Sequence, residues 1–187
     1  MKKEYTSGAS WNSASIAGLA MAAVTIVFEL VAGLCGKVPG VGGGFLGFLT
    51  WAAKLVICAL TFRFLLKRFH ESFADVDNSR IRKYGVKLAL CSSLLVAAYT
   101  LVNILVINPD SINEIIQGAR EGYASVLDSN SEAALEKMLP NMPAYIGVGT
   151  FVYCFIWGLV YSSVFARSLR SDNPFEDIEE PVDDQDS

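Results

Sequence analysis

Two side chains of opposite charge, Glu29 and Lys54, interrupt long apolar stretches of the sequence. A charged side chain at bilayer depth costs about 2.5–3.5 kcal/mol on insertion scales, so each of the two needs a partner. If both stretches cross a membrane as neighbouring helices, the two residues lie at similar depth in its outer half. We therefore predict an interhelical ion pair that fixes helix register. A proton or ion relay is one alternative, and no contact at all is the other.

Three further polar residues fall within apolar stretches. Arg63 lies near the expected cytoplasmic end of the second stretch, where a long basic side chain can reach the headgroups. Thr100 and Asn103 lie in the third stretch. We expect both to hydrogen-bond a neighbouring helix rather than a substrate.

Basic residues gather around the connection between the second and third stretches. Such a cluster attracts anionic lipid or a polyprenyl phosphate carrier, although an ordinary solvated face is the simpler interpretation. The candidates for binding an anionic lipid are Arg63, Lys67, Arg68, Arg82, Lys83 and Lys87.

The sequence lacks the residue motifs that common catalytic and metal sites need. His70 is the only histidine, and the four cysteines form no C-x-x-C pair, which argues against a zinc site. We interpret the cysteines as small packing residues. No H-E-x-x-H motif, Ser-His-Asp arrangement or pair of catalytic carboxylates occurs. We therefore expect neither enzymatic activity nor a cofactor or metal, and the net charge of −4 without a basic stripe gives no sign of nucleic-acid binding.

Four apolar runs determine the expected fold. They cover about 14–35, 45–66, 86–107 and 145–166, each close to the roughly 20 residues that a helix needs to cross a bilayer. Since lipid offers the backbone no hydrogen bonds, each run should be a helix. The sequence thus predicts an all-α, polytopic integral membrane protein with four transmembrane helices arranged as two hairpins.

The connections and the tail complete the expected organisation. The small-xxx-small spacing of Gly40 with Gly44, and of Gly43 with Gly47, would let the first two helices approach closely. The outer loop 108–143 carries a turn at Asn108–Ser111, an amphipathic helix after it, and a second short helix from Ser131 to before Pro140. Residues 1–170 form the membrane domain. Residues 171–187 hold eight carboxylates and no basic residue, so we expect a disordered cytoplasmic tail.

The distribution of lysine and arginine predicts the orientation. With the amino terminus inside, nine basic residues fall in cytoplasmic segments and three in outer loops. Because basic residues favour the cytoplasmic side, both termini should be cytoplasmic.

The sequence resembles a family of small four-span bacterial membrane proteins known as domain of unknown function 4199. The similarity lies in FRFLLKRF at the end of the second run, IRKYGVKLAL at the start of the third and INPDSINEII after it. It covers nearly the whole chain except the acidic tail. The resemblance implies a protein of the bacterial inner membrane with no assigned activity, and it supports an accessory role beside an enzyme of lipid-linked sugars. It supplies no catalytic residues.

Three functions are compatible with these features, of which a membrane enzyme that acts on lipid has the least support. The first is a non-enzymatic membrane scaffold or accessory subunit, indicated by the large outer loop, the acidic tail and the missing catalytic groups. The second is a small transporter or channel that works as an oligomer and uses Glu29 and Lys54. The expected partners are membrane lipids, together with a membrane enzyme or further copies of the chain.

Overall fold

The computed structural model describes residues 6–35, 41–73, 77–123 and 137–168, and every regular element within these ranges is helical. The all-α class is confirmed, and four of these helices are long and apolar enough to cross a membrane, as predicted. The elements, in chain order, are α1 (Ser7–Cys35), α2 (Val41–Ser72), α3 (Asn78–Val102), the π-helix η1 (Asn103–Ile107), α4 (Ser111–Tyr123), the 3-10 helix η2 (Leu139–Asn141) and α6 (Met142–Ser168).

The helices extend well beyond the apolar runs. α1 begins at Ser7 rather than near residue 14, and α3 begins at Asn78 rather than near residue 86. A helix continues past the hydrocarbon because its internal hydrogen bonds do not require apolar side chains. At the start of α3, Asp77 caps the helix, and its Oδ1 accepts a 2.7 Å hydrogen bond from the Asn78 amide. Most of the basic segment around residues 67–83 is therefore helical.

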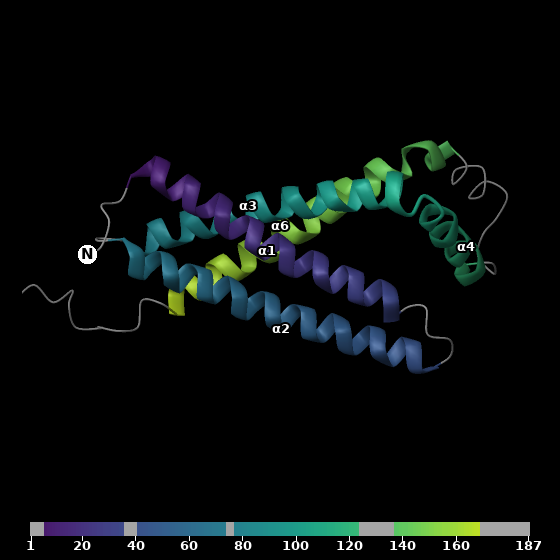
Figure 1. Cartoon of the computed structure of the whole chain (residues 1–187), viewed down its shortest axis with the longest axis horizontal. Coiled ribbons are helices and arrows are strands. Elements are labelled where there is room, and N and C mark those ends of the chain that lie inside the picture. The colour runs from purple at the N-terminus through teal and green to yellow at the C-terminus, as the bar shows by residue number, and fades with distance from the viewer. Residues whose placement is uncertain (1–5, 36–40, 74–76, 124–136, 169–187) are drawn as a thin grey trace, which may run out of the picture.

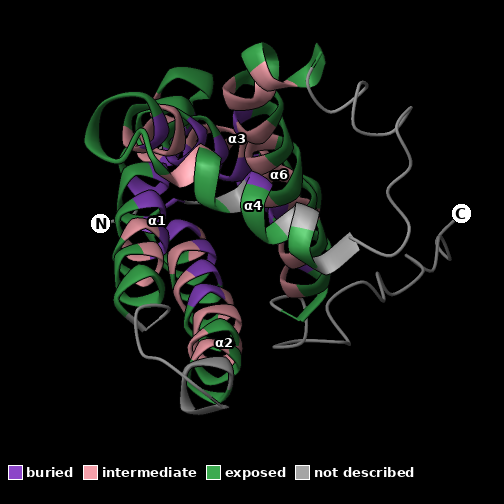
Figure 2. Ribbon diagram, turned by 90° about the vertical axis from the view of Figure 1, so that its right-hand side faces the viewer, coloured by how far each residue is buried: buried purple, intermediate pink, exposed green. Residues whose placement is uncertain are grey.

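The helix α3 organises the packing, since it has the most extensive contacts with α6 and packs on its other side against α1. α2 packs mainly against α1 and touches α3 and α6 less. Figure 1 shows α1 and α2 running side by side and crossing α3 and α6 obliquely. Seen from the end in Figure 2, α1 with α2 and α3 with α6 form the two arms of an open V.

The helices pack closely at glycines other than those that the sequence spacing predicted. A Cβ at Gly18 of α1 would lie 2.7 Å from Cys91 Cβ of α3, and one at Gly158 of α6 would collide with Ala89 of α3. By contrast, a Cβ at Gly47 would meet nothing within 4 Å, so the close contact predicted at this glycine is wrong; the surroundings of Gly40, Gly43 and Gly44 lie outside the described residues. The tightest contacts lie instead between α1 and α3 and between α3 and α6.

Buried residues concentrate in one half of the bundle. In α1 they stop at Thr25, and in α2 they begin at Cys58. We call this region the core half. It comprises residues 10–25 of α1, 58–72 of α2 with Phe73 after it, 81–97 of α3 and 158–166 of α6. We call residues 26–34 of α1 and 45–57 of α2 the open half, and no residue in these two ranges is buried. Figure 1 shows the two helix pairs separating toward this end.

The loop between the third and fourth long helices, residues 108–143, is described only in part. The turn predicted at Asn108–Ser111 is present, with Ser111 Oγ donating a 2.6 Å hydrogen bond to the Asn108 carbonyl, and the amphipathic α4 follows it. The second loop helix was predicted to stop before Pro140, and this is confirmed: residues 137 and 138 are α-helical, and the 3-10 helix η2, which contains Pro140, follows and leads directly into α6. Residues 124–136, which hold the predicted start of that helix, and the acidic segment 171–187 lie outside the described residues.

Candidate functional site: an intramembrane cavity beside an ion pair

The predicted contact between α1 and α2 is confirmed. Lys54 Nζ lies 3.4 Å from Glu29 Oε1, and the two side chains are 25% and 31% exposed. Apart from this pair, the open half has no buried contact joining α1 to α2. The pair is thus a polar link between the two helices, located beyond the end of their buried apolar packing.

A cavity of about 80 Å³ lies between α2 and α6, with residues of α1 and α3 completing its wall. It lies near the middle of each span: Cys58 is close to the centre of the α2 span, and Tyr153 to the centre of the α6 span. The lining residues are Met21, Thr25, Trp51, Lys54, Leu55, Cys58, Phe62, Ala89, Ser92, Val96, Tyr153, Cys154, Trp157, Gly158 and Tyr161.

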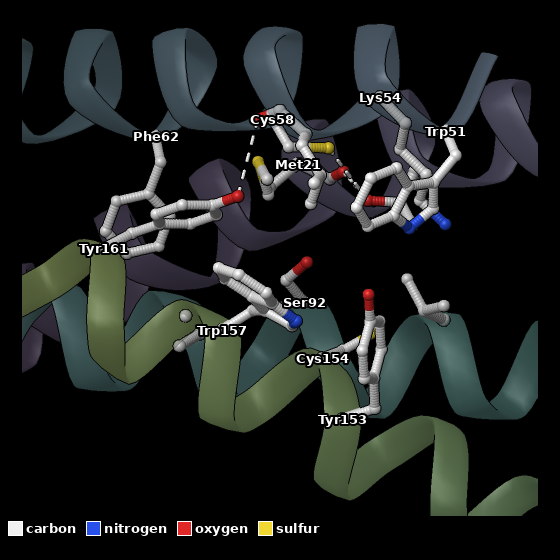
Figure 3. Close-up of a pocket in the computed structure, with 15 residues that line it drawn as sticks. Met21, Trp51, Lys54, Cys58, Phe62, Ser92, Tyr153, Cys154, Trp157 and Tyr161 are labelled. Carbon is white, nitrogen blue, oxygen red and sulfur yellow. Dashed lines mark hydrogen bonds between the residues drawn. The ribbon is translucent and has the colours of Figure 1, made fainter. Parts of the chain in front are cut away.

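Aromatic side chains dominate the wall that α6 provides. Tyr153, Trp157 and Tyr161 recur every four residues, so they lie above one another on one helix face. Their rings touch in sequence, with centroids 6.4 Å apart for Tyr153 and Trp157 and 5.8 Å apart for Trp157 and Tyr161. Figure 3 shows these rings facing Trp51 and Phe62 of α2 across the cavity. Gly158, on the same face, lets α6 press against α3 behind them.

The polar groups of the cavity divide into two sets. On the core side, the Tyr161 hydroxyl donates to the Leu55 carbonyl at 3.4 Å, and Thr25 Oγ1 donates to the Met21 carbonyl at 3.1 Å. Toward the open half, no hydrogen bond joins the Trp51 indole, the Trp157 indole or the Tyr153 hydroxyl to another residue of the described ranges. These side chains are not buried: Trp51 is 50% exposed, Tyr153 48% and Trp157 36%. These three donors therefore mark the part of the wall that a bound group could satisfy.

The predicted basic cluster is not one surface. Arg63, Lys67, Arg68, Arg82 and Lys83 are all exposed, but Arg68 lines a groove between α1 and α2, whereas Arg82 lines a separate hollow between α3 and α6. Lys67 lies 3.8 Å from Glu71 on its own helix.

Lys87 has a structural role in the same end of the bundle. Its Nζ donates to Ser10 Oγ at 3.3 Å and lies 5.0 Å from the centre of the Trp11 ring, which ties α3 to α1. A lysine held by a hydroxyl and a cation–π contact is less available to lipid than one that is free to reach the headgroups. The five exposed cations remain the better candidates for an anionic ligand.

The third-span polar residues behave differently from the prediction. Thr100 Oγ1 donates to the Val96 carbonyl of its own helix at 3.0 Å, so the interhelical bond expected of it is wrong. Asn103 begins the π-helix η1, and its carbonyl accepts a 2.7 Å hydrogen bond from the Asn108 amide. No side-chain bond from Asn103 to a described residue of another helix is present.

The aromatic wall was missed from the sequence, although its four-residue spacing was visible there. Within the described ranges, no group of three or more metal-ligating side chains comes together, and His70 lies in the last turn of α2. No family model matches the chain, and neither a curated protein nor a solved structure matches it. The resemblance to the four-span family therefore stays a prediction, and the function has to be argued from the cavity and its ion pair.

Proposed function

We propose that this chain is a non-catalytic accessory subunit of the bacterial inner membrane that receives a transmembrane segment of a partner between α2 and α6. Its four helices would cross the bilayer as two hairpins with both termini in the cytoplasm, as the distribution of basic residues favours. A reporter at Ser125 tests this orientation, because a cytoplasmic signal there would invert it. The partner we favour is an enzyme of lipid-linked sugars, in line with the family resemblance.

The observation that carries the proposal is the aromatic cavity near mid-span, with three donors in its wall that make no hydrogen bond to another described residue. Lipid tails are as apolar as helix surfaces, so helices associate in membranes through packing and interhelical hydrogen bonds. The Trp51 and Trp157 indoles and the Tyr153 hydroxyl offer both, because each joins a large flat ring to a donor. A cavity of about 80 Å³ has room for one side chain of a partner helix, and a side chain with a hydrogen-bond acceptor would suit these donors.

Photocrosslinking tests the proposal. A benzophenone amino acid replaces Trp157 in the cavity or, as the control, Val152, which is exposed on α6 five residues away and does not line the cavity. After irradiation of native membranes, we expect Trp157 to give one defined protein adduct and Val152 to give only lipid adducts. Lipid adducts alone at both positions would contradict a partner helix, and an adduct with a second copy would identify the partner as the chain itself.

A transporter or channel is the second candidate, and the ion pair beside the cavity is the observation that favours it. Lys54 both lines the cavity and pairs with Glu29, so a bound ion or proton could alter the pair directly. Ion flux in proteoliposomes that contain only this chain, abolished by Glu29→Gln, would select transport over the accessory role. The absence of such flux would remove this candidate.

A further inference from the structure

A second concavity, separate from the cavity between α2 and α6, lies between α1 and α2 at the core-half end of the bundle. This groove encloses about 610 Å³, and its walls come from the first turns of α1 and the last turns of α2. Its floor is Tyr84 of α3, which stacks on Phe69 with ring centroids 3.8 Å apart. The Tyr84 hydroxyl lies 3.3 Å from Ser13 Oγ, so the floor is anchored to α1 as well.

The polarity of this groove changes along its length. Asn12, Arg68 and Ser72 lie at the end nearer the helix termini, whereas Ala20 and Leu65 lie deeper in the spans. Eight residues separate Asn12 from Ala20, which corresponds to about 12 Å along a helix. A polar end beside an apolar end over this distance matches the join between a lipid headgroup and its first acyl carbons.

The charge at the polar end is positive. Arg68 is the charged residue among those lining the groove, and no carboxylate of the described residues lies within ion-pair distance of its guanidinium. The neighbouring Lys67, by contrast, pairs with Glu71. A guanidinium binds phosphate oxygens through two parallel hydrogen bonds, with a geometry that a lysine cannot supply.

We propose that this groove binds one anionic phospholipid. Its phosphate lies on Arg68 with the Asn12 amide as a further donor, and one acyl chain follows Ala20 and Leu65 into the bilayer. This site is distinct from diffuse attraction by all the basic residues, because it depends on one arginine beside a shaped apolar wall. It also does not depend on what occupies the cavity between α2 and α6.

Native mass spectrometry in detergent tests the charge requirement. The intact chain is titrated with phosphatidylglycerol and with phosphatidylcholine of identical acyl chains. Losing one arginine contact at a membrane surface corresponds to a change of about fivefold in affinity. We expect Arg68→Gln to weaken phosphatidylglycerol binding by about that factor and to leave phosphatidylcholine unchanged.

The matched control is Arg167→Gln, which removes an equal charge from an exposed position at the same end of the bundle but outside the groove. This variant should bind phosphatidylglycerol like the unaltered chain. Equal losses for Arg68→Gln and Arg167→Gln would overturn the site, since only the summed charge would then matter.

A second variant tests the apolar end without touching any charge. Ala20 is exposed within the groove, so Ala20→Phe fills it without entering the core. Ala32→Phe, at an exposed position in the open half of the same helix, is its control. We expect only Ala20→Phe to weaken phosphatidylglycerol binding, and unaltered binding would overturn the proposal. Tighter binding of a polyprenyl phosphate at equal concentration would overturn the choice of occupant.

Discussion

The core half and the open half of α1 and α2 are built from the same kinds of apolar residue, yet only one is packed. In the core half, Phe62 and Leu66 of α2 are 1% and 0% exposed and pack against the other helices. In the open half, Phe48 and Leu49 of the same helix are 63% and 54% exposed. Apolar character alone therefore does not decide where membrane helices meet.

The difference in packing between the two halves follows from whether small residues lie where the helices meet. Lipid provides no hydrophobic driving force between helices, so close approach requires residues that let backbones come together. Gly18 and Gly158 provide this in α1 and α6, and Ser162 of α6 meets Gly85 of α3. In the open half, Gly33 and Gly47 have no neighbour within 4 Å, and one ion pair carries the specific contact instead.

The largest expected effect comes from filling a contact of the core half. Gly158→Leu places a side chain where Ala89 of α3 lies, and overpacking of this kind costs about 1–3 kcal/mol. We expect the free energy of unfolding in a mixed-micelle titration to fall by that amount. Gly149→Leu is the matched control, because a Cβ there would meet nothing within 4 Å. Equal stability of the two variants would show that the helix contact around Gly158 does not hold the bundle together.

A smaller effect is expected in the open half. Removing one partner of an ion pair leaves a charge uncompensated, whereas removing both can be nearly neutral. Because Lys54 and Glu29 remain 25% and 31% exposed, we expect a coupling energy of only about 1 kcal/mol. Glu29→Gln and Lys54→Met should each lower stability, and the double variant should recover most of the loss.

Two outcomes of this double-mutant cycle would change the account. Strictly additive losses would mean that the two side chains do not interact in the membrane. Recovered stability together with lost cellular function would shift the assignment from accessory subunit to transport.

The sequence predicted the spans and the ion pair because both rest on strong constraints. About 20 apolar residues match the bilayer thickness, and Glu29 with Lys54 had few other ways to be neutralised. It did not predict the packing, because the sequence alone does not distinguish the glycine that presses against a neighbour, Gly158, from Gly47, which faces open space. The sequence did not predict the cavity for the same reason. The spacing of Tyr153, Trp157 and Tyr161 predicts a shared face, but not what that face opposes.

The arrangement of α2 and α6 is the central claim, and paired spin labels test it most directly. With the native cysteines replaced, one pair at Phe64 and Val164 reports the core half, and another at Phe48 and Val148 reports the open end; all four positions are exposed. We predict the same narrow distance for the first pair in detergent and in native membranes. The second pair should give a broad distribution in detergent that narrows in native membranes, where the partner is present. Narrow, identical distributions for both pairs under both conditions would contradict an opening that receives a partner.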